Sequence, residues 1–248
     1  MKFLRKIKRF GVPILDHIYD LTLIFKGAKT IHCIGDSHTS VFVYLSKNRI
    51  LKNTRMNFCI VQGATVSGIP NPGSKTQAGP IFESYLKNVP NKDYILLCLG
   101  EVDASYVIWY RSKKYGDHVD SQFKRAVNNY YNLLSKLLTK GHKHIIVCSV
   151  ALPTVKDGQV VGPITALRNK VSANIRERTN LTIRFNRKLR EYCRSHKIIF
   201  LDLEKKTLNK STMLIDDRFL NPDQNDHHLY EPVLANYVVQ EFKENGFS

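Results

Sequence analysis

The 248-residue sequence predicts one doubly wound α/β domain built around a five-stranded parallel sheet. Short apolar runs without polar alternation recur along the chain, which is typical of strands that are buried on both faces of a sheet. Longer segments with helical spacing of apolar residues separate these runs, and such alternation indicates the α/β class. A hydrophobic fraction of 43% is enough for a packed core and excludes a wholly disordered chain.

The five predicted strands are short and rich in Ile, Val, Leu and Cys. They are Thr30–Ile34, Asn57–Val61, Tyr94–Leu99, His144–Val150 and Lys197–Leu203. Ligands of such sheets bind outside the carboxyl ends of the strands, so functional residues are expected just after them. The Gly-, Pro- and Asn-rich stretch Gly68–Pro80 is a long loop, which we interpret as a functional flap instead of a domain boundary.

Three longer helices are predicted in the second half of the chain. The first carries apolar residues at helical spacing from Phe123 to Leu138, with Ser121 as its cap and Gly141 just past its end. The second spans about Thr179–Cys193. The last begins at Pro232, because proline is favoured at the first helical position.

Residues 1–28 are predicted to form a basic amphipathic segment that precedes the domain at 29–248. Asp16 and Asp20 interrupt its apolar stretch, and no small-residue cleavage site follows, which argues against a signal peptide. The chain has no run of about 18 apolar residues, so no membrane span is predicted. Two interpretations stay open: a helix lying on an anionic membrane surface, or a helix packed on the domain with a solvated basic edge.

The chain carries 38 Lys and Arg against 21 Asp and Glu, a formal net charge of +17. Nucleic acid is not expected as a partner, because no helix-turn-helix, RNP or zinc-finger pattern accompanies the charge. The five cysteines include no CxxC pair, and most lie in apolar runs, which indicates buried, reduced thiols. A cytoplasmic location is therefore expected, at the inner membrane face if the segment 1–28 binds lipid.

A serine and a histidine-rich segment are predicted to meet at the carboxyl edge of the sheet. Ser37 follows the first strand, and Asp223–His228 follows the last one. A serine nucleophile needs a base, usually a histidine held by a carboxylate, and a helix N-terminus offers N–H donors to a developing oxyanion. The chain order Ser…Asp-x-His therefore predicts nucleophilic acyl transfer.

These motifs resemble the SGNH/GDSL hydrolase superfamily over nearly the whole chain from Lys29 onward. The serine motif of that family matches Gly35-Asp36-Ser37, and Gly63 stands at the place of its second-block glycine. Gly100 opens the third block, and His228 is followed by Leu as is common in the family. The resemblance implies a flavodoxin-like three-layer α/β/α sandwich. It also implies Ser37 as nucleophile, His228 as base, and an oxyanion hole made by the backbone N–H groups of Ser37 and Gly63.

The sequence departs from the family pattern at two positions. Val102 stands where the third block has an asparagine that donates to the oxyanion, and Asn225 stands where the last block has its aspartate. Losing one oxyanion donor costs on the order of 10²–10³ in rate in a typical acyl-transfer enzyme.

The acid of the triad is therefore open at this stage. Asp226 is favoured, Asp223 competes with it, and Asn225 is a neutral alternative that would accept a hydrogen bond from the ring. His227 is the alternate base, and Asp223 would be its better-spaced partner.

Three further residues are candidates for binding substrate. Glu101 and Asp103 in the third block either cap the next helix or bind a sugar hydroxyl. Arg184 lies in the basic stretch Leu167–Arg190, which either is a solvated helix face or holds an anionic glycan or the phosphates of an acyl-CoA.

No metal and no cofactor are expected, apart from acetyl-CoA as acyl donor if the protein is a transferase. Asp223, Asp226, His227 and His228 are ligand types that suit zinc, but adjacent histidines rarely both bind one ion. No GxxxxGK[ST] loop or GxGxxG turn is present, so no nucleotide site is predicted.

The leading functional hypothesis is a serine esterase acting on an O-acyl group of a carbohydrate, most simply an O-acetyl group. The third block and the loop before it resemble those of family members in bacterial surface-polysaccharide clusters. The alternative with the same chemistry is a polysaccharide O-acetyltransferase. Val102 and Asn225 motivate a hypothesis of another class, a non-catalytic protein that binds glycan or membrane on the same scaffold.

Overall fold

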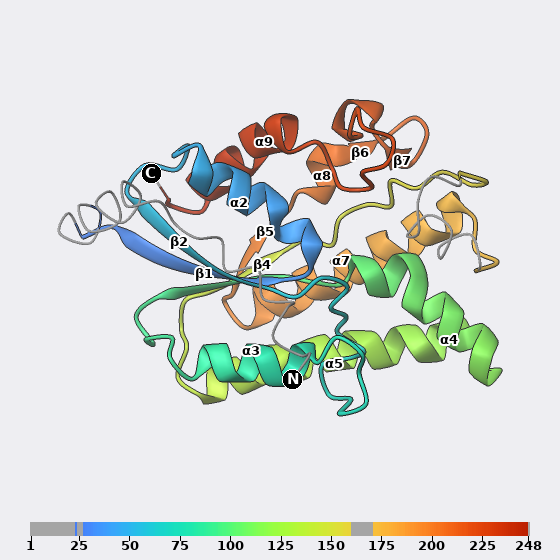
Figure 1. The fold of residues 1–248 in the computed structure, drawn as a ribbon, viewed down its shortest axis with the longest axis horizontal. Helices are drawn as coiled ribbons and strands as arrows, with labels where there is room; N and C mark the ends of the chain where they lie inside the picture. The colour runs from blue at the N-terminus through green and yellow to red at the C-terminus, as the bar shows by residue number, and fades with distance from the viewer. Residues whose placement is uncertain (1–22, 24–26, 160–170, 248) are drawn as a thin grey trace, which may run out of the picture.

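A computed structural model describes residue 23 and residues 27–159 and 171–247, which form a five-stranded parallel sheet between two layers of helices (Figure 1). The strand order is β2-β1-β3-β4-β5. The strands are β1 (Lys29–Gly35), β2 (Thr54–Ile60), β3 (Tyr94–Cys98), β4 (Ile145–Cys148) and β5 (Ile199–Leu201). The predicted α/β/α fold class and the parallel sheet are confirmed.

The predicted strands overlap the observed ones. Their ends differ because the observed ends depend on which residues pair with the neighbouring strand. β2 begins at Thr54, before the apolar run starts, because Thr54 pairs with Lys29 at the start of β1. β5 is shorter than the apolar run, since its three residues pair with Ile146–Cys148 only.

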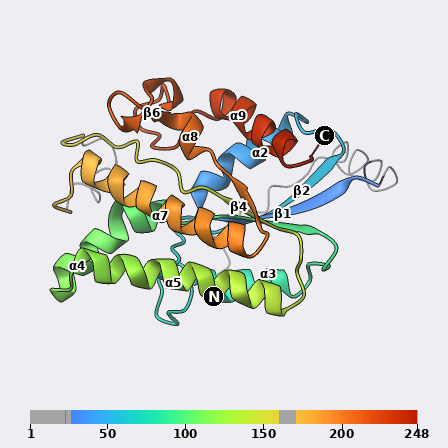
Figure 2. The same cartoon turned by 180° about the vertical axis from the view of Figure 1, so that it is seen from behind.

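The helices divide between the two faces of the sheet. On one face lie α2 (Ser40–Lys47) and α9 (Glu231–Glu244). On the other face lie α3 (Ala78–Leu86), α4 (Ile108–Tyr115), α5 (Val119–Thr139) and α7 (Ile175–Ser195), as the view from behind also shows (Figure 2). Apolar side chains on both faces of the strands explain why the sequence runs do not alternate with polar residues.

Shorter elements complete the connections. They are the 3₁₀ turn η1 (Ser37–Thr39), the π-helical turn η2 (Asp103–Val107), α8 (Glu204–Thr207), the hairpin of β6 (Leu208–Asn209) and β7 (Leu214–Ile215), and η3 (Asp217–Phe219). In the described part of the chain, no helix combines the length and apolarity needed to cross a bilayer.

Helix boundaries correct the sequence analysis in two places. The cap of α5 is His118, whose ring nitrogen accepts from the N–H of Asp120, and not Ser121, which lies inside the first turn. Gly79 and Pro80 belong to the first turn of α3, so the predicted loop ends at Gln77. Proline is tolerated there because a first-turn N–H needs no helical partner.

Two other predictions have different outcomes. α9 begins at Glu231, one residue before the predicted start at Pro232, so this prediction is confirmed to within one residue. The predicted basic amphipathic segment 1–28 lies outside the described residues except for Leu23, Gly27 and Ala28, so neither interpretation of it is tested.

Candidate active site

Ser37 begins the turn that follows β1, at the carboxyl edge of the sheet. Gly35 allows this turn, because a Cβ there would lie 2.1 Å from the carbonyl oxygen of Cys98 on β3. The buried Asp36 side chain accepts the N–H of His38 at 2.8 Å and so caps η1. Asp36 therefore has the structural role expected of an acid in such a turn, and Ser37 stays partly exposed.

Asp226 is the carboxylate that contacts the predicted base. Its Oδ1 lies 2.5 Å from His228 Nδ1 and also accepts the backbone N–H of His228 at 2.9 Å. Asn221 donates to the other oxygen at 3.0 Å. Asp223 accepts instead from the backbone and the side chain of Asn225, and both of these residues are exposed. Of the candidate partners for His228, Asp226 alone has the required contact among the described residues.

The second ring nitrogen of His228 is buried and has no hydrogen-bond partner. Burial, followed by the charge of the neighbouring His38, lowers the pKa of His228 below 6.5, although Asp226 acts in the opposite direction. A neutral ring with its proton on Nδ1, facing Asp226, carries a lone pair on Nε2. In this conformation no hydrogen bond joins Nε2 to Ser37.

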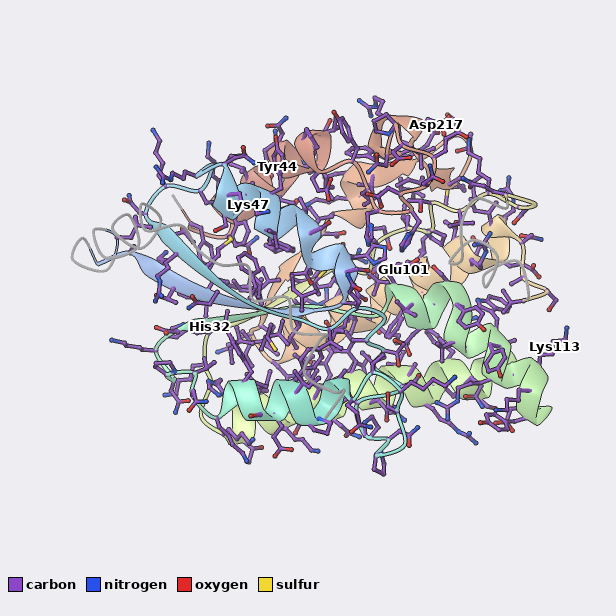
Figure 3. The ribbon with its side chains drawn as sticks, viewed as in Figure 1. His32, Tyr44, Lys47, Glu101, Lys113 and Asp217 are labelled. Carbon is purple, nitrogen blue, oxygen red and sulfur yellow. The ribbon has the colours of Figure 1, made fainter. Side chains whose placement is uncertain are left out.

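His38 lies between two carboxylates and against the ring of His228. Its Nδ1 is 3.3 Å from Asp36 Oδ1, its Nε2 is 3.6 Å from Glu101 Oε2, and its ring centroid is 4.9 Å from that of His228. Figure 3 labels Glu101 near the first turn of α2, and this buried side chain accepts from Ser105 Oγ at 2.6 Å. Glu101 therefore lies in the interior, next to the Nε2 atom of His38. From the sequence, His38 is expected to begin the helix after Ser37, and its contacts with Glu101 and His228 become visible only in the folded chain.

Asp103 supports the loop after β2. It is fully buried, and its two oxygens accept the N–H groups of Val66 at 2.8 Å and Ser67 at 3.0 Å. Burial raises the pKa of Asp103 to about 6, against the effect of these hydrogen bonds. The proposed contact between Asp103 and a sugar hydroxyl is not compatible with this burial, so Asp103 is a positioning residue.

Gly63 is exposed in the turn that follows β2, beside the end of β1. The N–H of Val61 donates to the carbonyl of Gly35 at 3.0 Å, and Gly63 follows with φ +69°. Among the described residues, the backbone N–H groups of Ser37 and Gly63 form no hydrogen bond. Val102 lies at the start of the helical segment after β3 and has no side-chain donor.

Arg184 links two helices. Its guanidinium donates to Asp120 Oδ1 at 2.8 Å and lies 4.8 Å from the ring centroid of Phe123, both on α5. Through these contacts Arg184 connects α7 to α5. Neither contact involves a residue of the segment Asp223–His228.

A small cavity and a larger cleft flank the histidines. The cavity measures about 30 Å³ and is lined mainly by apolar or small side chains beside His38 and His228. The cleft measures about 560 Å³ and borders Asp226 and His227. Its walls are the segments 154–159 and 220–227, which carry several polar side chains: Thr154, Lys156, Asp157, Gln159, Asn221 and Gln224.

The comparison with known proteins supports the fold. No protein-family model matches this chain, and no curated protein sequence matches it. A GDSL-like lipase from Bacteroides thetaiotaomicron is 13% identical and has a TM-score of 0.55, with 92% of this chain and 97% of that chain covered.

An acetyl xylan esterase is also 13% identical, with a TM-score of 0.52 over 88% of this chain and 99% of that chain. A lipase/acylhydrolase from Enterococcus faecalis is 16% identical, with a TM-score of 0.50 over 88% and 96%. The chain therefore has the fold of the SGNH/GDSL hydrolases, the superfamily that its motifs resemble.

Proposed function

We propose that this protein is a serine esterase that removes a small acyl group, an O-acetyl group, from a carbohydrate. The observation that carries the proposal is the contact between Asp226 and His228. The ring of His228 also packs against His38, the residue that directly follows Ser37. A nucleophile, a base and a group that orients the base are the three parts that such chemistry needs.

The proposed reaction proceeds through an acyl-enzyme. Ser37 Oγ attacks the carbonyl carbon of the ester, and its proton passes to Nε2 of His228. The tetrahedral intermediate collapses, and the sugar oxygen leaves with that proton. Water then attacks the acyl-serine with His228 again as base, which releases the carboxylic acid and restores Ser37. The absence of a Ser37–His228 hydrogen bond does not oppose this, since such bonds often tighten only in the substrate complex.

The oxyanion is proposed to bind to the backbone N–H groups of Ser37 and Gly63. Both groups follow adjacent strands at the same sheet edge, and neither is used by another described residue. Two preorganised donors replace the three that the family pattern has, because Val102 supplies none.

The cavity and the cleft support the proposed substrate class. A volume of about 30 Å³ beside His228 holds one or two water-sized groups, which suits an acetyl methyl better than a longer acyl chain. The polar cleft of about 560 Å³ next to Asp226 is large enough for sugar units and offers hydrogen-bonding side chains. The acetyl xylan esterase among the similar structures is consistent with this class but shares only the fold.

The test uses p-nitrophenyl acetate and a fluorophosphonate probe. Wild type is expected to label and to show a burst of p-nitrophenol, and Ser37→Ala is expected to lose both, while Ser46→Ala on α2 keeps them. Equal labelling and equal rates in Ser37→Ala would refute the proposal. Failure of folded wild type to label would favour the non-catalytic binding protein instead.

Substrate class is tested in the same assay with longer esters. Rates are expected to fall from acetate to butyrate and further to octanoate, because the cavity beside His228 does not hold the longer chains. A faster reaction with octanoate would contradict the acetyl assignment. The transferase alternative predicts release of free CoA from acetyl-CoA only when a glycan acceptor is present.

A further inference from the structure

We propose that His38, His227 and His228 form a binding site for a divalent transition-metal ion such as Zn²⁺, and that a bound ion switches the esterase off. The binding of the ion does not depend on the proposed function, whereas the switch rests on the proposed esterase function. The site combines the residue after Ser37 with the two adjacent histidines before α9.

The three rings form one cluster. The centroids of His227 and His228 are 4.2 Å apart, those of His38 and His228 4.9 Å, and those of His38 and His227 5.6 Å. One ring nitrogen from each residue can be chosen so that all three lie within 4.8 Å of one another. Zinc binds histidine nitrogens at about 2.0–2.1 Å, which separates two ligand atoms by roughly 3.3 Å, so the nitrogens need to approach one another by up to about 1.5 Å.

Carboxylates already orient two of the three rings. Histidine ligands commonly donate their second N–H to a carboxylate, which fixes the ring and raises its basicity. His228 Nδ1 faces Asp226 in this way, and His38 Nδ1 lies 3.3 Å from Asp36. The remaining Nε2 atom of His228 is buried and has no hydrogen-bond partner among the described residues, so its lone pair is available to a ligand.

The charge near the cluster also favours a cation. Glu101 Oε2 lies 3.6 Å from Nε2 of His38, and Glu101 is buried. Imidazole nitrogens suit Zn²⁺, Cu²⁺, Ni²⁺ and Co²⁺, whereas Mg²⁺ and Ca²⁺ prefer oxygen ligands. The site is therefore expected to discriminate against Mg²⁺ and Ca²⁺.

The switch follows from the double use of one lone pair. Nε2 of His228 has to accept the proton of Ser37 in the proposed reaction, and the same lone pair would bind the ion. A bound ion therefore leaves Ser37 without its base, and removal of the ion by a chelator restores it. The ion is not a cofactor in this proposal.

Metal binding is tested directly on the full chain without a polyhistidine tag. Calorimetry with Zn²⁺ and visible absorption with Co²⁺ are expected to show one ion per chain. His38→Gln and His227→Gln are each expected to raise the Kd at least tenfold. His118→Gln is the matched control, because the His118 side chain is 81% exposed and lies outside the cluster, and it is expected to bind as wild type does. No binding tighter than roughly 1 mM, or equal binding by the cluster variants, would overturn the site.

Inhibition is tested with p-nitrophenyl acetate, each variant being compared with its own metal-free rate. The inhibition constant of Zn²⁺ is expected to equal its Kd, to rise by the same factor in His227→Gln, and to be reversed by EDTA. An ion that binds without slowing the reaction overturns the switch. A protein that binds Zn²⁺ but never hydrolyses esters supports the site and overturns the switch together with the proposed function. An active esterase that binds no ion overturns the site alone.

Discussion

The two ring nitrogens of His228 have different surroundings. Asp226 holds Nδ1, and Nε2 is buried with no partner. Burial alone would raise the pKa of Asp226, but the hydrogen bonds from the backbone and ring of His228 lower it below its usual value. The ionised carboxylate therefore orients a neutral ring, which is the arrangement that a general base requires.

Asp226→Asn tests the orienting role. An amide in place of the carboxylate favours the wrong ring tautomer, so kcat for p-nitrophenyl acetate is expected to fall by about 10³–10⁴. Asp223→Asn is the matched control and is expected to keep kcat near the wild-type value, because Asp223 contacts Asn225 and not the histidine. Comparable losses in the two variants would contradict the assignment.

The pH profile tests the surroundings of His228. The base works only when it is neutral, so kcat/KM is expected to fall on the acid side with an apparent pKa below 6.5. After burial, the electrostatic interaction with His38 is the next cause that lowers the pKa of His228, so His38→Gln is expected to move the acid limb to higher pH. His118→Gln serves as control. A shift of the acid limb to lower pH in His38→Gln would contradict the prediction that His38 lowers the pKa of His228.

At the scale of elements, the turn from β3 into the helical segment depends on Gly100. Its φ is +114°, and a Cβ there would lie 2.9 Å from Val150 Cγ2 and 3.3 Å from Phe185 Cε1. A side chain at this position would meet both backbone strain and a packed core.

Gly100→Ala is expected to lower the free energy of unfolding by about 2–4 kcal/mol, since strain and overpacking both contribute. Gly116→Ala provides the comparison, because Gly116 also has positive φ (+68°) but nothing lies within 4 Å of its Cβ position. This control is expected to cost only about 1–2 kcal/mol. Urea unfolding measures both, and equal costs would remove the packing argument.

Asp103 connects the third block to the loop that carries Gly63. Replacing it by Asn removes one acceptor and leaves a buried N–H of Val66 or Ser67 unpaired, which costs roughly 1–3 kcal/mol. Because the loop positions a proposed oxyanion donor, kcat is also expected to fall in Asp103→Asn.

The raised pKa of Asp103 makes the free energy of unfolding depend on pH. Its folded pKa of about 6 is raised above 3.8, so its contribution to stability is full below pH 3.8 and is lost as the pH rises through 6. The advantage of wild type over Asp103→Asn is therefore expected to be larger at pH 4 than at pH 7, by on the order of 3 kcal/mol. Chemical unfolding at the two pH values checks this, and a difference of the opposite sign would contradict it.

At the scale of the whole molecule, the positive charge is spread over the chain. Residues 1–28 hold six Lys and Arg and two Asp, a net +4, which leaves +13 of the total +17 for residues 29–248. The domain charge alone can attract anionic surfaces, so only a comparison of matched substitutions can identify a role for the first segment.

Chains with Lys2, Lys6 and Lys8 changed to Gln are expected to bind anionic vesicles on the order of a hundredfold more weakly, since each charge lost near the surface is worth about 1 kcal/mol. The control changes Lys47, Lys87 and Lys113 to Gln, with the same change in net charge, and is expected to bind nearly as wild type does. Co-sedimentation with phosphatidylserine vesicles measures both. Equal losses would mean that the segment 1–28 has no special role.

The sequence by itself determined the fold class, the five strands and the place of Ser37. These features are local, since a fully apolar run marks a buried strand and a Gly-Asp-Ser turn after it marks the sheet edge. The same local patterns placed α9 within one residue of its observed start. They failed for the cap of α5, because His118 and Ser121 are both compatible with a helix start and only the folded backbone selects one.

Only the tertiary structure decided which side chains meet. Asp226 and Asp223 were both compatible with the spacing, and the fold of the segment before α9 brings Asp226 alone to His228. Asp103 reaches the loop after β2 across 37 residues of chain, and Glu101 reaches His38 from the helical segment after β3. Such contacts depend on strand order and on burial, which local propensities do not encode, so the support of the site becomes visible only in the folded chain.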